Sequence, residues 1–199
     1  IDALGSRLGR HGGCSGTEAI RMLRDTEVGK PGKIYVARAA FVDEVDMFDS
    51  TFFGISPAEA SVMDPQQRML LEVTLEAFER SGMPQTALAG TPTGVFAGCC
   101  SSDYGAVVAM AMETGVQTGS PYVGTGTAAN GISGRLSFTF GLQGPSFTVD
   151  TACSSSLVAS SLACDSLASS QSKVAVIAGV QLNIAAVGFV VLCQMRALS

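Results

Sequence analysis

The spacing of apolar residues along the chain predicts an α/β fold. Residues 146–149 (SFTV) combine β-branched and aromatic side chains, which is typical of a strand, and residues 93–99 (TGVFAGC) predict another strand. Residues 174–180 (VAVIAGV) form an uninterrupted apolar run, as expected for a parallel strand that is buried on both faces. Helical patterns separate these segments along the chain.

The first clear helix begins at Asp64 and Pro65, since a capping carboxylate followed by proline is a good helix start. One apolar face follows at helical spacing and contains Leu71, Leu75 and Phe78. The helix is expected to end at residues 81–82 (SG). Five charged residues are expected to form its solvated face: Arg68, Glu72, Glu76, Glu79 and Arg80.

A second helix is predicted over residues 154–168, directly after the strand at 146–149. Its large apolar residues are expected to turn inward: Leu157, Val158, Leu162 and Leu167. The strand, turn and helix together place Cys153 at a helix N-terminus.

Cys153 is the candidate nucleophile of the chain. Unpaired backbone N–H groups and the positive end of a helix dipole favour the thiolate over the thiol, and the same N–H groups can hold an oxyanion. The alternative is a buried structural cysteine, which is the common role of a free thiol.

Composition narrows the possible functions. The chain has 199 residues, a mass of 20.4 kDa and 47% hydrophobic residues, enough for one domain with a sizeable core. A net charge of −5 and no basic run argue against nucleic-acid binding. No secretory signal pattern is visible in the given residues, although a removed targeting peptide stays an open alternative.

Six cysteines are irregularly spaced, at positions 14, 99, 100, 153, 164 and 193. They match neither a metal-binding spacing nor a disulfide framework. We therefore expect free thiols in a reducing intracellular compartment, with no metal and no cofactor.

Several motifs carry a resemblance to a known family. Residues 149–157 (VDTACSSSL), with 135–137 (RLS) and 141–145 (GLQGP) upstream, closely resemble the active-site motif of β-ketoacyl synthases. They resemble in particular the ketosynthase domains of modular polyketide synthases. Residues 52–57 (FFGISP) and 63–72 (MDPQQRMLLE) resemble a second motif of that family, in the required order.

The resemblance implies a thiolase-like α/β fold, of which residues 1–199 are the N-terminal half: a mixed sheet covered by helices, with a nucleophile elbow at 149–157. It implies that Cys153 accepts an acyl group from an acyl carrier protein for decarboxylative condensation. The family's two catalytic histidines belong to the second half, whereas this chain has only His11, expected to be structural or solvent-exposed. The isolated chain is therefore expected not to condense.

The same resemblance implies partners. One half of a thiolase-like fold leaves a large apolar face exposed, so the missing half or a homodimer is expected, with the strand ending at Thr151 at a pairing edge. An alternative is a non-catalytic subunit, descended from a ketosynthase, in a larger assembly. Residues 174–194 carry no charge, which fits either a membrane association of such an assembly or a buried strand followed by a loop.

Overall fold

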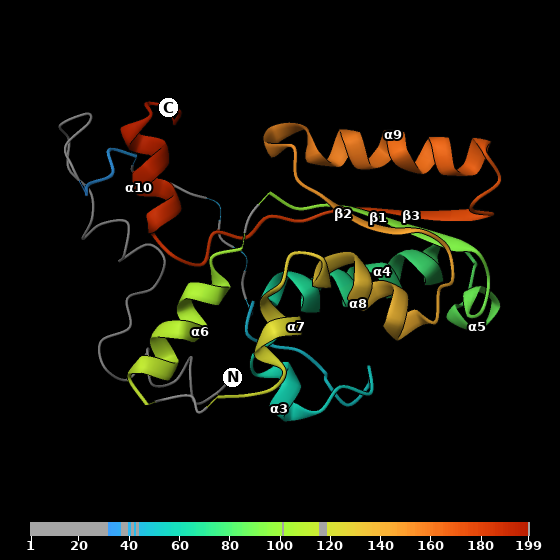
Figure 1. Cartoon of the computed structure of the whole chain (residues 1–199), viewed down its shortest axis with the longest axis horizontal. Coiled ribbons are helices and arrows are strands. Elements are labelled where there is room, and N and C mark those ends of the chain that lie inside the picture. The colour runs from blue at the N-terminus through green and yellow to red at the C-terminus, as the bar shows by residue number, and fades with distance from the viewer. Residues whose placement is uncertain are drawn as a thin grey trace. The chain divides into compact units, whose positions relative to one another are not determined.

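The computed structural model describes residues 32–36, 40, 42, 44–100, 102–115 and 119–198 (Figure 1). His11 lies outside these described residues. The chain forms two compact units. The larger comprises Phe48–Val108 and Gly119–Leu182; the smaller comprises Ile1–Met47, Ala109–Thr118 and Asn183–Ser199.

The larger unit is built on three strands, β1 (Thr93–Gly98), β2 (Ser146–Val149) and β3 (Val174–Gly179). All three predicted strands are thus confirmed to within a residue. They pair in parallel in the order β2-β1-β3, with Val95 opposite Ser146 and Val176.

The outer strands differ from each other in how well they match expectation. β2 lies at an edge of the described sheet, as predicted. β3 lies at the opposite edge, and Ile177 is 48% exposed, so the expectation that this strand is buried on both faces is wrong for the described part of the chain. The antiparallel strand that a mixed sheet requires is not among the described strands.

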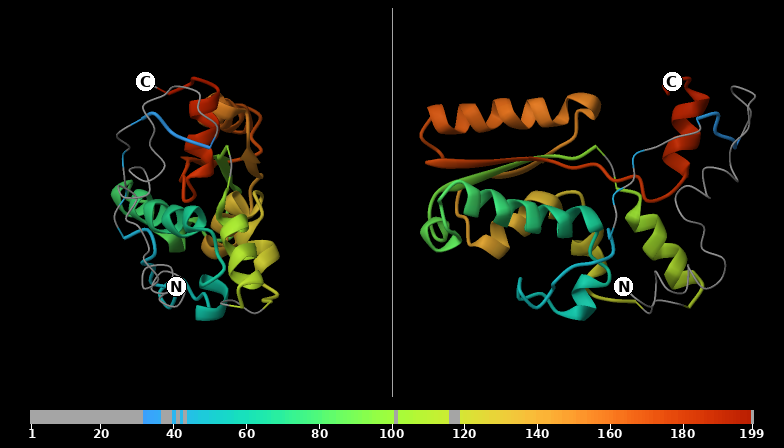
Figure 2. Two further views of the ribbon diagram at one scale, coloured as in Figure 1. Left: turned by 90° about the vertical axis from the view of Figure 1, so that its left-hand side faces the viewer. Right: turned by 180° about the vertical axis from the view of Figure 1, so that it is seen from behind.

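Helices cover both faces of the sheet, in three layers. Helix α9 (Ser155–Ala168) lies on one face, and α4 (Pro65–Arg80) and α8 (Gly131–Phe140) lie on the other (Figure 1). Figure 2 shows the same layers from behind. The chain enters α9 directly from β2, so the residues between them lie at the carboxyl edge of the sheet.

Helix α4 follows its prediction along most of its length. The Asp64 carboxylate caps it by accepting the Gln66 N–H at 2.8 Å, and Ser81 is its C-cap. Leu71 and Phe78 are buried, and Phe78 packs edge-on against Phe140 of α8 at 5.1 Å between ring centroids.

The prediction of a solvated Arg68 is wrong. Arg68 is only 2% exposed, because the whole first turn of α4 is buried. That turn packs against the C-terminal part of α7 (Val123–Thr127), where the Gln67 side-chain amide donates to the carbonyls of Thr125 and Gly126 at 3.1 Å.

The predicted inward face of α9 is also wrong. Leu157 is 74% exposed, and Leu162 and Leu167 are 38% and 42% exposed. The residues that face the sheet are instead small: Ala159 and Ala163 are fully buried and cluster with Phe96 of β1.

Close approach explains this orientation of α9. A Cβ atom placed on Gly98 of β1 would lie 2.7 Å from the backbone nitrogen of Ser156, and one on Gly179 of β3 would lie 3.3 Å from the Ser156 Cβ. No leucine fits between surfaces that lie so near each other, so the large side chains of α9 point away from the sheet.

Short helices complete the described part of the chain: α3 (Pro57–Ala60), α5 (Gln85–Leu88), α6 (Tyr104–Glu113), the 3-10 turn η1 (Ala152–Ser154) and α10 (Val187–Gln194). In the smaller unit, Ile34 and Val36 form an apolar cluster with Cys193 of α10. No helix among the described residues is long and apolar enough to cross a membrane. Residues 174–194 instead form β3, a connecting segment and α10.

The contact between α9 and β1 predicts a specific sensitivity. Gly98→Ala should lower the free energy of unfolding by roughly 1–3 kcal/mol, because the added methyl group collides with helix backbone. Gly124→Ala is the matched control, since an added Cβ there meets nothing within 4 Å, and its effect should stay within about 1 kcal/mol. Chemical denaturation of both variants measures the difference, and equal effects would contradict the close-packing argument.

Candidate active site

Cys153 lies on a sharp turn between β2 and α9. It belongs to η1, and α9 begins two residues later at Ser155. Its neighbour Ala152 has φ of +54°, a left-handed conformation that residues with a side chain rarely adopt. Backbone strain of this kind is typical of functional sites, where the surrounding structure holds the residue in place.

Hydrogen bonds within the turn provide that support. The Ser155 hydroxyl donates to the Ala152 carbonyl at 2.7 Å and accepts the Thr151 N–H at 2.9 Å. The Asp150 carboxylate accepts the Ala152 N–H at 2.9 Å, and the Ser154 hydroxyl donates to the Thr151 carbonyl at 2.8 Å. Hydrogen bonds therefore hold both the N–H and the carbonyl of the strained Ala152.

The side chain of Cys153 is exposed, so the interpretation as a buried structural thiol is wrong. The structure places it directly before α9, as the sequence predicted. Ser154, the N-cap residue of α9, makes no side-chain hydrogen bond to the first turn. The first turn of α9 therefore has no side-chain cap. The chemical role of Cys153 stays a prediction.

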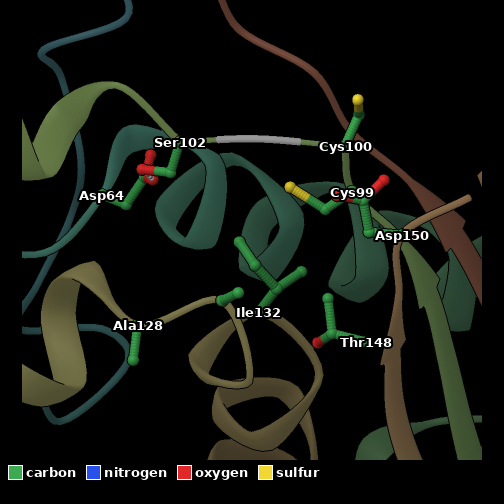
Figure 3. A pocket seen from close by; sticks show the side chains of 9 residues that line it. Asp64, Cys99, Cys100, Ser102, Ala128, Ile132, Thr148 and Asp150 are labelled. Atoms are coloured by element: carbon green, nitrogen blue, oxygen red, sulfur yellow. Dashed lines mark hydrogen bonds between the residues drawn. The ribbon is translucent and has the colours of Figure 1, made fainter. Parts of the chain in front are cut away.

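A second thiol, that of Cys100, lies at the same edge of the sheet. β1 and β2 remain paired to their ends, because the Cys99 N–H donates to the Val149 carbonyl at 3.1 Å. Cys100 therefore leaves the sheet beside Asp150 (Figure 3). Partial desolvation raises the pKa of the Cys100 thiol, and the negative charge of the Asp150 carboxylate and the nearby Cys153 raise it further.

A buried polar cluster supports this edge from beneath. Asp64, 1% exposed, accepts hydrogen bonds from the backbone and the side-chain amide of Gln66 and from the Ser102 hydroxyl. The Gln66 side-chain oxygen accepts the Leu182 N–H at 3.0 Å and lies 3.8 Å from the Cys99 sulfur. The start of α4 is thereby joined to the segments that follow β1 and β3.

Between this cluster and β2 lies a small cavity of about 90 Å³, lined by Asp64, Ser102, Thr148 and Asp150 among others (Figure 3). The Thr148 hydroxyl donates to Ser133 of α8 at 3.0 Å. Among the described residues, no group of histidine, cysteine and acidic side chains is arranged to hold a metal ion.

A wider open hollow of about 630 Å³ lies over α8, and Cys153 is not among its lining residues. Its wall includes Arg135, which forms a largely buried ion pair with Glu59 of α3 at 2.6 Å. Arg135 belongs to one of the motifs noted in the sequence, and this contact gives it a structural role. Phe138 also lines the hollow and is 83% exposed.

Sequence reasoning missed Cys100, Asp150, Ser155 and Gln66. The first three follow from the strand register and the turn, which no local pattern encodes. The sequence did contain a signal for Gln66, which follows the capping Asp64 and Pro65 in the first turn of α4. A glutamine in a turn that is buried needs hydrogen-bond partners.

Comparison with known proteins establishes the family. The sequence profile of the β-ketoacyl synthase N-terminal domain matches residues 13–199. The chain therefore belongs to the β-ketoacyl synthase family, as the motifs predicted.

Individual relatives are modular polyketide synthases. The chain is 49% identical over 160 residues to polyketide synthase GfsB of Streptomyces halstedii, covering 80% of this chain and 3% of that protein. It is 44% identical over 180 residues to erythronolide synthase EryA2 of Saccharopolyspora erythraea, covering 90% of this chain and 5% of that protein. The chain thus spans a small part of these relatives.

Solved structures show the same fold. The oxazolomycin ketosynthase domain OzmH KS7 of Streptomyces albus JA3453 superposes with a TM-score of 0.79 at 30% identity, covering 88% of this chain and 30% of that domain. The module 6 ketosynthase of the bacillaene synthase of Bacillus subtilis gives 0.77 at 28% identity, with coverages of 92% and 28%. The fold is therefore thiolase-like, as predicted, and the parallel sheet with its helices is one half of it.

The bonding of the turn predicts that Ser155 stabilises it. Ser155→Ala should lower the free energy of unfolding by about 1 kcal/mol, because the Thr151 N–H and the Ala152 carbonyl lose their partner. Ser160→Ala, which removes only a hydroxyl bonded to its own helix, should cost less than about 0.5 kcal/mol. Thermal or chemical denaturation compares the two, and a neutral Ser155→Ala would show that the turn does not depend on this side chain.

Proposed function

We propose that this chain is the acyl-accepting part of a polyketide synthase ketosynthase domain and that Cys153 is its nucleophile. The observation that carries the proposal is the strained turn at Ala152, which holds an exposed cysteine directly before α9. In the reaction, the Cys153 sulfur attacks the carbonyl carbon of an acyl thioester. A tetrahedral oxyanion forms, the carrier thiolate leaves, and the acyl group remains on Cys153.

The start of α9 is suited to this step, because backbone N–H groups at a helix N-terminus can hydrogen-bond a developing oxyanion. The carbon–carbon bond-forming step needs further acid–base groups. His11 is the only histidine of the chain, so the histidines that assist decarboxylation in the family have to come from residues beyond this chain. We therefore propose acyl transfer, and not condensation, as the activity of residues 1–199.

The chain is proposed to be a partial ketosynthase domain, with its nucleophile elbow at 149–157. The exposed apolar side chains of the larger unit support this: Leu157, Leu162, Leu167 and Ile177. They lie on the outer face of α9 and on β3. A monomeric soluble protein seldom leaves such a surface uncovered, and the second half of the domain is the proposed cover.

Two partners are proposed by analogy with the family. An acyl carrier protein would deliver the acyl thioester to Cys153. A second copy of the domain would pair along β2, an edge of the described sheet where Phe147 is 51% exposed.

The alternative is a non-catalytic, ketosynthase-derived subunit of a larger assembly. The exposed apolar surface favours it as much as it favours a missing half. The two readings differ at Cys153: only the catalytic one requires that this thiol react with a thioester.

Acyl loading tests the proposal. After incubation with a short-chain acyl thioester, the tryptic peptide 136–173 should gain the mass of one acyl group, and Cys153→Ala should lose that gain completely. Cys164→Ala is the matched control, because it removes the other thiol of the same peptide and should leave loading unchanged. A folded protein whose Cys153 stays unmodified would refute the catalytic proposal and favour the structural subunit.

A further inference from the structure

The hydroxyl group of Ser155 joins the first residue of α9 to the turn that carries Cys153. It accepts the Thr151 N–H at 2.9 Å and donates to the Ala152 carbonyl at 2.7 Å, so it acts as acceptor and donor at once. Ser155 is 6% exposed, whereas Cys153 is exposed. A buried side chain therefore holds the backbone that leads into the exposed cysteine.

The bond to the Ala152 carbonyl bears most directly on Cys153. That carbonyl and the Cys153 N–H belong to one planar peptide unit, so a bond that fixes the direction of the carbonyl also fixes the direction in which the Cys153 backbone begins. Ala152 has φ of +54°, a left-handed conformation that a residue with a Cβ atom tends to leave. The Ser155 hydroxyl opposes that relaxation.

Ser155 has little freedom to shift, because the backbone at the start of α9 lies against β1. A Cβ atom placed on Gly98 would lie 2.8 Å from the Ser155 carbonyl carbon and 2.7 Å from the Ser156 nitrogen. The Ser155 hydroxyl thus relates the turn to a helix whose distance from the sheet is fixed. A chain of contacts runs from β1 through the start of α9 to the peptide unit before Cys153.

We infer that Ser155 is a positioning residue for the acyl transfer: its hydroxyl holds Cys153 in the orientation from which the sulfur attacks an acyl thioester. This role rests on the proposed function of Cys153 and adds a residue to it. The Ser155 side chain is buried and bonded to the backbone, so it acts through Cys153 and not on the substrate. A misplacement of about 1 Å can slow a reaction about 100-fold, so such a residue affects the rate more than the stability.

Two reactions of Cys153 separate its orientation from its intrinsic reactivity. Acyl transfer requires alignment of the sulfur, the thioester carbonyl and the N–H groups at the start of α9. Alkylation by iodoacetamide requires only that an exposed thiolate meets a small reagent. A loss of positioning should therefore slow acyl loading and leave alkylation nearly unchanged, whereas a change in the amount of thiolate would alter both rates.

The test measures both rates in the purified protein that carries this chain, on Cys153 itself, by tandem mass spectrometry of the tryptic peptide 136–173. With a saturating short-chain acyl thioester, Ser155→Ala should load about 10- to 100-fold more slowly, while its alkylation rate should change by less than about threefold. Ser166→Ala is the matched control, because it removes another buried hydroxyl of α9, which bonds to Ser172 at 2.7 Å near the other end of the helix. It should lose similar stability and load at the unaltered rate.

Asp150 provides a second test at an exposed position, where a substitution does not disturb the core. Its carboxylate accepts the Ala152 N–H at 2.9 Å, on the other side of the same strained residue. Asp150→Ala should lower the ratio of loading to alkylation, as Ser155→Ala does. Asp150→Asn keeps an oxygen that can accept the N–H, so it should retain a higher ratio than Asp150→Ala.

The nucleophilic role of Cys153 and the positioning role of Ser155 fail in different ways. If the unaltered protein takes up no acyl group on Cys153, the proposed function is refuted and the positioning role with it. If the unaltered protein loads, the positioning role alone is overturned when Ser155→Ala loads equally fast or loses loading and alkylation to the same extent. If Ser155→Ala does not fold, equal ratios for Asp150→Ala and Asp150→Asn overturn it.

Discussion

The close contact between α9 and the sheet is the constraint on which the rest of the larger unit depends. Ala159 and Ala163 are fully buried against Phe96, and Gly98 leaves room for helix backbone where any side chain would collide. Because α9 lies so near the strands, the chain has only a few residues in which to leave β2 and enter the helix. The left-handed Ala152 and the bonds of Ser155 make that short passage, and Cys153 is held at its outermost point.

The same contact determines the outer surface. A helix that faces the sheet with alanine and serine must carry its large apolar side chains elsewhere, and Leu157, Leu162 and Leu167 are therefore exposed. On this account α9 is an internal layer of a larger domain. The sheet covers one side of the helix, and the proposed second half of the domain covers the other. The chemistry at its N-terminus and the apolar surface along its side have one structural cause.

Local patterns in the sequence predicted much of this fold. The three strands, the cap and apolar face of α4, and the position of Cys153 before a helix depend on neighbouring residues, and all were predicted correctly. The orientation of α9 was not, because leucine spacing assumes that the larger residues are buried. Here the limited space between helix and sheet selects the smaller ones instead.

The rest of the site depends on contacts between distant segments. Arg68 was expected in solvent, yet the whole first turn of α4 is buried. Gln66 bonds to Leu182, 116 residues away, and Cys100 meets Asp150 only through the register of β1 and β2. No periodicity along the chain encodes such contacts between distant segments. The motif resemblance, in contrast, identified the family and the candidate nucleophile directly.

The most direct test of the account uses Cys164, which lies seven residues after Leu157 on α9 and is exposed here. Its rate of alkylation by iodoacetamide would be measured in the native protein isolated from its source and again after unfolding. If the outer face of α9 is an internal surface of the assembled domain, Cys164 should be protected in the native protein and react only after unfolding. Equal rates in the two states would contradict the account, because the apolar face of α9 would then be open to solvent.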